Sequence, residues 1–232
     1  MSFGKIFYDG YDLNRYASIS GVVGFTTNTT IIRQAGYSSY KRFYEDNAHL
    51  IAGRPISFQV FSDNSETVIA QAKQIDSIGN NIYVKIPIVN SVGESMIETI
   101  NAILSMGIRV NITAVFTPSQ ISRLESDLIT SGTPTIISIF GGRISDTGID
   151  PKLVIKDACQ RFSEKDEIEI LWCGCKDNLV IQNAKDVACH IVTLPDAVIS
   201  RINRIGMSLE SLSVDTVKAF LQDAIGNNLS VF

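Results

Sequence analysis

One lysine lies inside a run of apolar residues, where a charged side chain is unusual. Lys85 has strand-forming hydrophobic neighbours on both sides, in the run from Ile82 to Pro87. Burying an ammonium group is costly, and burial favours the neutral amine, which is a nucleophile. Such an amine condenses with a ketone, and the resulting iminium withdraws electrons from the neighbouring carbon–carbon bond. The run therefore indicates a Schiff-base lysine. The alternative is a lysine that ends an edge strand and extends to solvent.

Two more polar residues lie in short apolar runs of the kind that form strands. Asp9 closes the first run of the chain, and Gln59 lies in the third. A carboxylate beside the reacting carbons can act as general acid and base, and an amide can hold a water that relays the proton. Either residue alone would more often cap a helix or form a hydrogen bond at the end of a strand. Together with Lys85 they indicate a single catalytic site.

Short β-branched runs alternate with longer segments of helical period, which is typical of strand–helix units around a parallel sheet. The expected strands are Lys5–Asp9, Gly21–Thr26, Ile56–Phe61, Ile82–Ile86, Val110–Val115, Thr135–Ile139, Ile168–Cys173 and His190–Leu194. The expected helices include Ser65–Ile78, Gly93–Met106, Pro118–Ser131 and Asp177–Val187. Thr117 before Pro118, with Gln120 three residues after the threonine, predicts a capped helix start.

Eight such units in 232 residues predict an α/β fold, namely a (β/α)8 TIM barrel that forms one domain over residues 1–232. An open doubly wound sheet is the alternative, but no glycine-rich GxGxxG turn follows the first strand. The tail from Leu209 to Ile225 predicts an extra amphipathic helix, which would cover either the barrel or a neighbouring subunit.

Polar residues recur where the expected strands end. In a TIM barrel these ends converge on one face, which carries the active site. The residues are Asp9, Asn28, Gln59, Lys85, Asn111, Thr113, Ser138, Arg143 and Lys176.

Composition excludes several classes of partner. The formal charge of −4 and the pI near 5.2, without clustered Lys and Arg, argue against nucleic acid. No apolar stretch is long enough to span a membrane, and no signal segment is recognised at the start, so we expect a cytoplasmic protein. Cys159, Cys173, Cys175 and Cys189 do not form a metal set, and we expect reduced, mostly buried thiols with no metal and no cofactor.

Five separated segments resemble, in the expected order, motifs of the transaldolase family, including its small transaldolase and fructose-6-phosphate aldolase members. Together they cover nearly the whole chain. They are Phe7-Tyr8-Asp9, Gly24-Phe25-Thr26-Thr27-Asn28, Val84-Lys85-Ile86-Pro87, the strand from Val110 to Phe116 with Gln120, and the segment from Ser138 to Arg143.

The resemblance implies a role for each matched residue. Lys85 would form the imine and Asp9 would move the proton, while Thr113 and Gln59 would position the water. The hydroxyls of a dihydroxyacetone unit would be bound by Asn28, Asn111 and Ser138, and Arg143 would face a phosphate. The implied substrate is a sugar or sugar phosphate of carbohydrate metabolism, and small family members commonly form homo-oligomers through their C-terminal helices.

At several positions that distinguish the two branches of the family, the sequence follows one branch or the other. Gln59 follows the aldolase branch, whereas Phe140, like Asn111 and Ser138, follows the transaldolase branch. After the seventh strand, Gly174 and Lys176 replace a serine and an arginine that bind phosphate in the family, and a lysine offers one point charge in place of a bidentate fork.

Three functions are therefore open. The first is transaldolase-like transfer of a dihydroxyacetone unit from a ketose to an aldose. The second is a class I aldolase of the fructose-6-phosphate type. The third, from another class, is a catalytically weakened barrel that binds sugar phosphates, because a fold does not guarantee a function.

Overall fold

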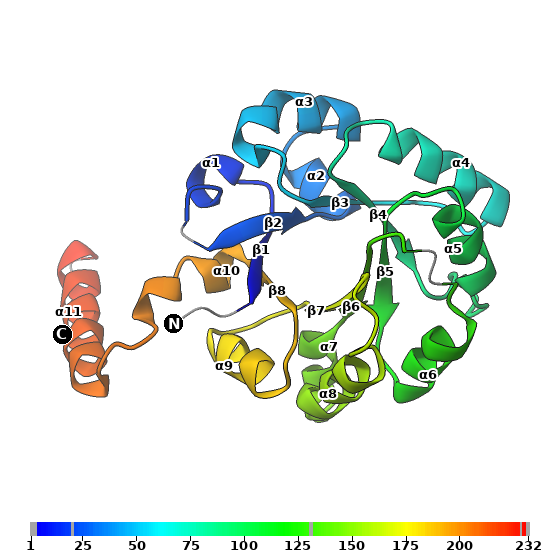
Figure 1. The fold of residues 1–232 in the computed structure, drawn as a ribbon. Helices are drawn as coiled ribbons and strands as arrows, with labels where there is room; N and C mark the ends of the chain where they lie inside the picture. The colour runs from blue at the N-terminus through cyan, green and yellow to red at the C-terminus, as the bar shows by residue number, and fades with distance from the viewer. Residues whose placement is uncertain (1–3, 20, 130–131, 228, 231–232) are drawn as a thin grey trace. The chain divides into compact units, whose positions relative to one another are not determined.

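The computed structural model describes residues 4–19, 21–129, 132–227 and 229–230. In these residues eight parallel strands close into a barrel in chain order (Figure 1). Their bounds are β1 Lys5–Asp9, β2 Val22–Thr26, β3 Ile56–Gln59, β4 Ile82–Pro87, β5 Val110–Val115, β6 Thr135–Ile139, β7 Ile168–Trp172 and β8 Ile191–Pro195. The predicted barrel is confirmed, and the open doubly wound alternative is wrong because β1 pairs with β8.

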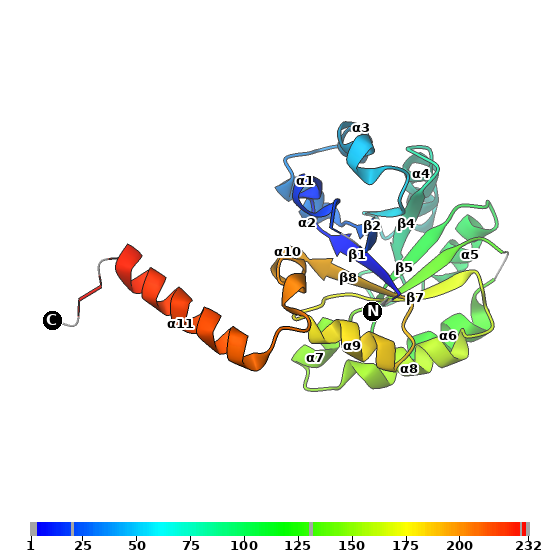
Figure 2. The same ribbon diagram turned by 60° about the vertical axis from the view of Figure 1, so that its left-hand side comes forward.

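The helices lie outside the ring of strands from α1 to α10 (Figures 1 and 2). Their bounds are α1 Leu13–Tyr16, α2 Thr29–Gln34, α3 Tyr40–Ile51, α4 Ser65–Asp76, α5 Ile97–Leu104, α6 Pro118–Asp127, α7 Gly141–Asp146, α8 Pro151–Arg161, α9 Leu179–Asp186 and α10 Asp196–Ile199. A 3-10 turn, Ile202–Arg204, and the helix α11, Leu209–Gly226, follow.

Side-chain caps explain where several helices begin. The predicted capping box at α6 is present, with Thr117 Oγ1 accepting from the Gln120 backbone and Gln120 Oε1 accepting from the Thr117 backbone. Asn64 caps α4 by accepting from the Thr67 backbone, and Asp150 caps α8 ahead of Pro151. The expected end of α6 at residue 131 lies outside the described residues. The helix itself ends at Asp127.

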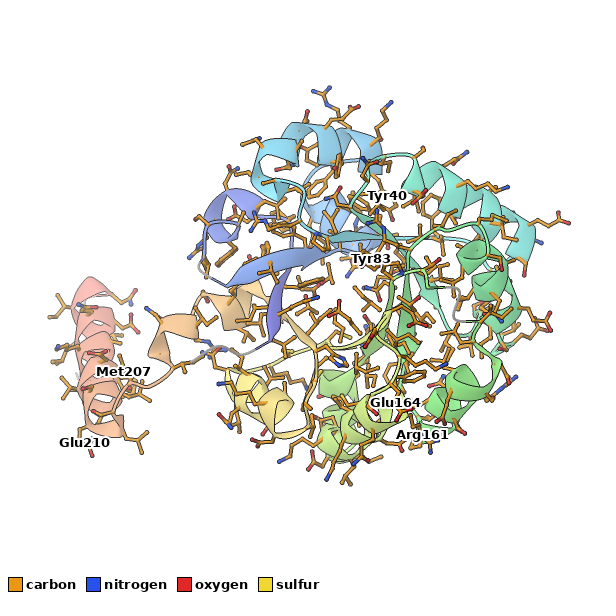
Figure 3. The ribbon with its side chains drawn as sticks, in the orientation of Figure 1. Tyr40, Tyr83, Arg161, Glu164, Met207 and Glu210 are labelled. Carbon is orange, nitrogen blue, oxygen red and sulfur yellow. The ribbon has the colours of Figure 1, made fainter. Side chains whose placement is uncertain are left out.

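Alternation along the strands sorts side chains between the barrel interior and the helix layer. Outward side chains such as Val84 and Ile86 are fully buried under the helices. At the amino-terminal end of the barrel, Lys5 forms a 2.7 Å ion pair with Glu169 across the β1 and β7 strands. Tyr83, labelled in Figure 3, packs in a buried interior cluster with neighbours from β1, β6, β7 and β8. The interior is thus a packed core, and chemistry is confined to the other end.

The described residues fall into two compact units, one ending at Ile199 and one beginning at Ser200. The first holds the barrel, and the second holds α11, which confirms the predicted C-terminal helix. Whether residues 1–232 form one domain stays a prediction. No described helix combines the length and apolar character that crossing a membrane requires.

Candidate active site at the carboxyl ends of the strands

Lys85 lies in β4 and is 7% exposed, so its charge is held within the barrel. Its register partners are Gln59 on β3 and Asn111 on β5. The ammonium donates to the backbone oxygen of Thr27 at 3.3 Å. Because β4 is flanked by strands on both sides, the alternative of an edge-strand lysine extending to solvent is wrong.

Asp9 ends β1, and its carboxylate belongs to a short hydroxyl chain. Thr26, the last residue of β2, donates to Asp9 Oδ1 at 2.7 Å. The Thr26 hydroxyl is also 2.6 Å from that of Thr193 on β8. Both threonines are buried, and they come from the two strands that flank β1. The neighbouring strands therefore fix the position of the carboxylate.

Opposing effects act on the acidity of Asp9. Burial raises the pKa of its carboxyl above the ordinary value, the positive charge of Lys85 and the hydrogen bond from Thr26 lower it, and the charge of Asp196 raises it. The negative charge of Asp9 in turn raises the pKa of the Cys173 and Cys175 thiols. Net elevation of the pKa suits a group that must both take up and return a proton.

Gln59 ends β3, and Thr113 lies two residues before the end of β5. The Gln59 backbone oxygen accepts from Tyr40 Oη at 2.8 Å, which anchors the end of the strand. Thr113 Oγ1 is buried and has no hydrogen-bond partner among the described residues. It precedes Ala114, whose φ of 58° is in the left-handed region, at an irregularity in the β5–β6 register. Such bulges re-aim side chains next to active sites.

Asn111 and Ser138 form a buried hydrogen-bonded chain with Ser57. Ser138 Oγ donates to Asn111 Oδ1 at 2.7 Å, and Asn111 Nδ2 donates to Ser57 Oγ at 3.0 Å. All three side chains are at most 1% exposed. The chain fixes which end of the Asn111 amide faces each neighbouring strand and leaves one amide hydrogen for a further partner. That Asn111 and Ser138 bind substrate hydroxyls stays a prediction.

Asn28 follows β2 and caps α2. Its Oδ1 accepts from the Ile31 backbone at 2.9 Å, so the amide nitrogen is left to donate elsewhere. The missing proline after Asn28 does not prevent the helix start, because Thr29 takes the first helical position.

The predicted phosphate residues have different environments. Arg143 is exposed on α7, and its guanidinium carbon lies 5.2 Å from the ring centre of Phe140, which caps the same helix. Lys176 follows β7 and forms an ion pair with Asp146, also on α7. Arg143 is therefore on α7 and Lys176 lies beside it, and the Asp146 carboxylate partly neutralises the charge of Lys176.

The glycine that replaces the family serine has a structural reason in this chain. Gly174 has a φ of 71°, which disfavours any side chain. A Cβ on Gly142 would lie 1.7 Å from the Gly174 backbone oxygen. The close approach thus excludes a side chain at Gly142. A Cβ on Gly174 itself would lie 3.5 Å from the Gly142 backbone, an ordinary contact, so the positive φ of Gly174 and not a lack of space disfavours a serine there.

Sequence reasoning missed four interior residues, namely Thr26, Ser57, Thr193 and Cys173. The first three are named above as hydrogen-bond partners. Cys173 is buried, and burial raises the pKa of its thiol to about 12, although the charges of Lys85 and Arg143 lower it. The two-residue period of strands could have indicated Thr26 and Ser57, because side chains two positions apart share a face. Thr26 lies two positions before Asn28, and Ser57 lies two positions before Gln59.

The four cysteines are all free and buried, as expected. Within the part of the chain that the structure describes, no group of three or more His, Cys, Asp or Glu side chains could hold a metal ion.

Nearly the whole chain is similar to known sequences. The model of a family described as Transaldolase/Fructose-6-phosphate aldolase matches residues 6–229. A probable transaldolase of Thermoanaerobacter sp. (strain X514) is 29% identical over 202 residues, covering 85% of this chain and 88% of the relative. A probable transaldolase of Bdellovibrio bacteriovorus is 28% identical over 223 residues, covering 94% and 96%.

Solved structures share the architecture at low identity. 3-Hexulose-6-phosphate synthase from Salmonella typhimurium has a TM-score of 0.55 at 14% identity, covering 83% of this chain and 89% of that chain. Orotidine 5'-phosphate decarboxylase from Pyrococcus horikoshii OT3 has a TM-score of 0.54 at 16% identity, covering 84% and 90%. At these identities the likeness concerns the fold alone.

Proposed function

Because this chain belongs to the transaldolase/fructose-6-phosphate aldolase family, we propose that it transfers a dihydroxyacetone unit between a ketose and an aldose through a Schiff base on Lys85. The observation that carries this proposal is the burial of Lys85 inside the barrel, close enough to Asp9 for its charge to act on that carboxyl. A buried amine whose charge acts on a buried carboxylate has an evident use in imine chemistry and little use in a protein that only binds.

In the proposed reaction the amine of Lys85 adds to the ketose carbonyl, and loss of water leaves a protonated imine. Asp9 then takes the proton of the C4 hydroxyl. The C3–C4 bond breaks, its electron pair moves to the iminium, and an aldose leaves. The resulting enamine attacks the aldehyde of a second aldose, Asp9 returns the proton to the new alkoxide, and water releases the product from Lys85.

The remaining predicted residues serve binding and water. Gln59 and Thr113 would hold the water that relays protons, and the unpartnered hydroxyl of Thr113 supports this role. Asn28, Asn111 and Ser138 would bind the hydroxyls of the three-carbon unit. Arg143 and Lys176 would face the phosphate of a sugar-phosphate substrate.

A second candidate is an aldolase that releases dihydroxyacetone to water. It differs only in whether protonation of the enamine outpaces its capture by an aldehyde. Gln59 favours it, since the aldolase branch has glutamine at this position, whereas Phe140 favours transfer. A weakened sugar-phosphate-binding barrel is the third candidate, and the ion pair of Lys176 with Asp146 is the observation that favours it.

The proposal includes assembly of copies of this chain through α11. Apolar side chains cover much of this helix, and none of its residues is buried. Leu209, Val217, Phe220 and Ile225 are each more than half exposed. A monomer rarely leaves such a surface in water.

Borohydride trapping tests the proposed chemistry directly. Reduction in the presence of fructose 6-phosphate should add a three-carbon unit to Lys85, located by mass spectrometry of peptides. Lys85→Met should abolish the adduct while the protein stays folded, because the change removes a buried charge at similar volume. Lys73→Met, which changes an exposed lysine on α4, is the matched control and should keep the adduct. Labelling of another lysine would overturn the mechanism.

A further inference from the structure

A hollow of about 330 Å³ opens beside the candidate active site. We call it the Phe61 hollow, and its lining residues are Thr29, Ile32, Tyr37, Ser38, Ser39, Tyr40 and Phe61. Thr29 begins α2 three residues after the end of β2, and Phe61 lies two residues past the end of β3. The hollow therefore lies at the carboxyl ends of the strands, the face on which barrel enzymes bind substrates.

Two lining residues of the hollow adjoin residues assigned to the reaction. Its Thr29 follows Asn28 in the chain, and its Tyr40 donates to the backbone oxygen of Gln59. The Tyr40 ring, labelled in Figure 3, stacks on Phe58 with centroids 4.9 Å apart. Burial raises the pKa of Tyr40 to about 12, so the phenol stays a neutral donor near pH 7. The Tyr40 side of the hollow is thus held in place at the end of β3.

The lining identifies the chemistry that the hollow can bind. Phe61 is 66% exposed, an unusual state for a phenylalanine, and its ring lies edge-on to that of Tyr40, 6.2 Å away. Hydroxyls of Thr29 and Ser38 share the hollow with these rings. All seven lining residues are uncharged, so nothing in the hollow favours a phosphate. Aromatic faces with nearby hydroxyls suit the C–H face and the hydroxyls of a neutral polyhydroxy chain.

We infer that the Phe61 hollow is a binding subsite for the carbon chain of an unphosphorylated aldose acceptor. This inference rests on the proposed function, because an acceptor exists only if Lys85 holds a three-carbon unit. Phosphorylated acceptors would instead be directed to Arg143 and Lys176, which lie beside α7. The enzyme would then have two acceptor routes that depend on different residues.

Acceptors of different length distinguish an effect at this subsite from an effect at the reacting centre. Phe61→Ala should raise the KM for erythrose about three- to ten-fold, the range expected for losing one aromatic contact, with little change in kcat. The two-carbon glycolaldehyde is too short to extend beyond the aldehyde site, and its KM should stay within two-fold. Phe61→Leu keeps apolar area but removes the ring, and it should lie between Phe61→Ala and the parent protein.

Leu153→Ala is the matched control, because Leu153 is 71% exposed on α8 and should alter neither KM. An equal change in KM for both acceptors, or none for either, would overturn the inference. Erythritol cannot form an imine, so its titration monitored by NMR tests the hollow without Lys85. We expect the resonances of the lining residues to move in the parent protein and not in Phe61→Ala. If borohydride trapping fails while erythritol binds there, the proposed function is wrong and the site remains.

Discussion

Replacing Thr26 with valine should move the acidity of Asp9 in a predictable direction. The Thr26 hydroxyl donates to the Asp9 carboxylate at 2.7 Å within the barrel, and this bond lowers the pKa of a carboxyl that burial raises. Hydrogen bonds to charged groups contribute about 1.5–3 kcal/mol, and about 1.4 kcal/mol corresponds to one pKa unit. The neutral acid can also accept from Thr26 and so keeps part of this energy. We therefore expect Thr26→Val to raise the pKa of Asp9 by about 1.

Thr193 should act only through Thr26. The two hydroxyls are 2.6 Å apart, and when Thr26 donates its proton to Asp9, Thr193 must be the donor between them. Chains of hydrogen bonds strengthen one another by roughly 10–30% per bond. Thr193→Val should thus raise the pKa of Asp9 by about 0.1–0.3 in the parent protein. It should have no effect in the Thr26→Val background, and Thr193→Ser should behave as the parent.

The assay is an NMR titration of the carboxyl carbon of Asp9, combined with the pH profile of kcat/KM. Loss of a donor to the ionised carboxyl destabilises the ionised form, so the acid limb of the profile moves to higher pH. Circular dichroism checks that each variant is folded. An effect of Thr193→Val that persists without the Thr26 hydroxyl would refute the chain. So would a lower pKa of Asp9 in Thr26→Val.

Other predictions concern phosphate binding, reaction balance, backbone conformation and assembly. Arg143→Ala should cost about 1–2 kcal/mol of transition-state binding with a phosphorylated acceptor, and Lys176→Ala less, because that ammonium is already ion-paired. Equal losses with unphosphorylated glyceraldehyde would mean that the arginine is structural. Phe140→Tyr should shift the ratio of transfer to free aldol cleavage towards cleavage, since a phenol gives the catalytic water another partner; an unchanged ratio would place the ring away from the reacting carbons. Gly174→Ser should lower the free energy of unfolding in urea by about 1–2 kcal/mol, because its φ is 71°, and unchanged stability would contradict the strain. Leu221→Asp should lower the mass measured by light scattering while helix content is kept, and an unchanged mass would exclude this face of α11 from assembly.

The sequence alone determined the barrel and which polar residues lie towards the carboxyl ends of its strands. Strand and helix periods alternate clearly enough to predict β1 to β8 to within two residues at each end, because local hydrophobic spacing reflects which face each element buries. The place of Lys85 inside the barrel was predictable because its neighbours in the sequence on both sides are strand-forming hydrophobic residues. The place of Asp9 on the same face was predictable because it closes a strand, and the carboxyl ends of barrel strands point to one face.

Contacts between distant segments could not be predicted in this way. Thr193 is 167 residues from Thr26, and only closure of the barrel through β8 brings the two hydroxyls together. The left-handed backbone at Ala114, next to Thr113, coincides with an irregularity in the register with β6 and leaves no local sequence signal. The ion pair of Lys176 with Asp146 joins the loop after β7 to the last residue of α7, 30 residues away in the chain. Residue spacing specifies which side chains share a face, whereas strand closure and loop packing decide which of them meet, and these depend on the whole chain.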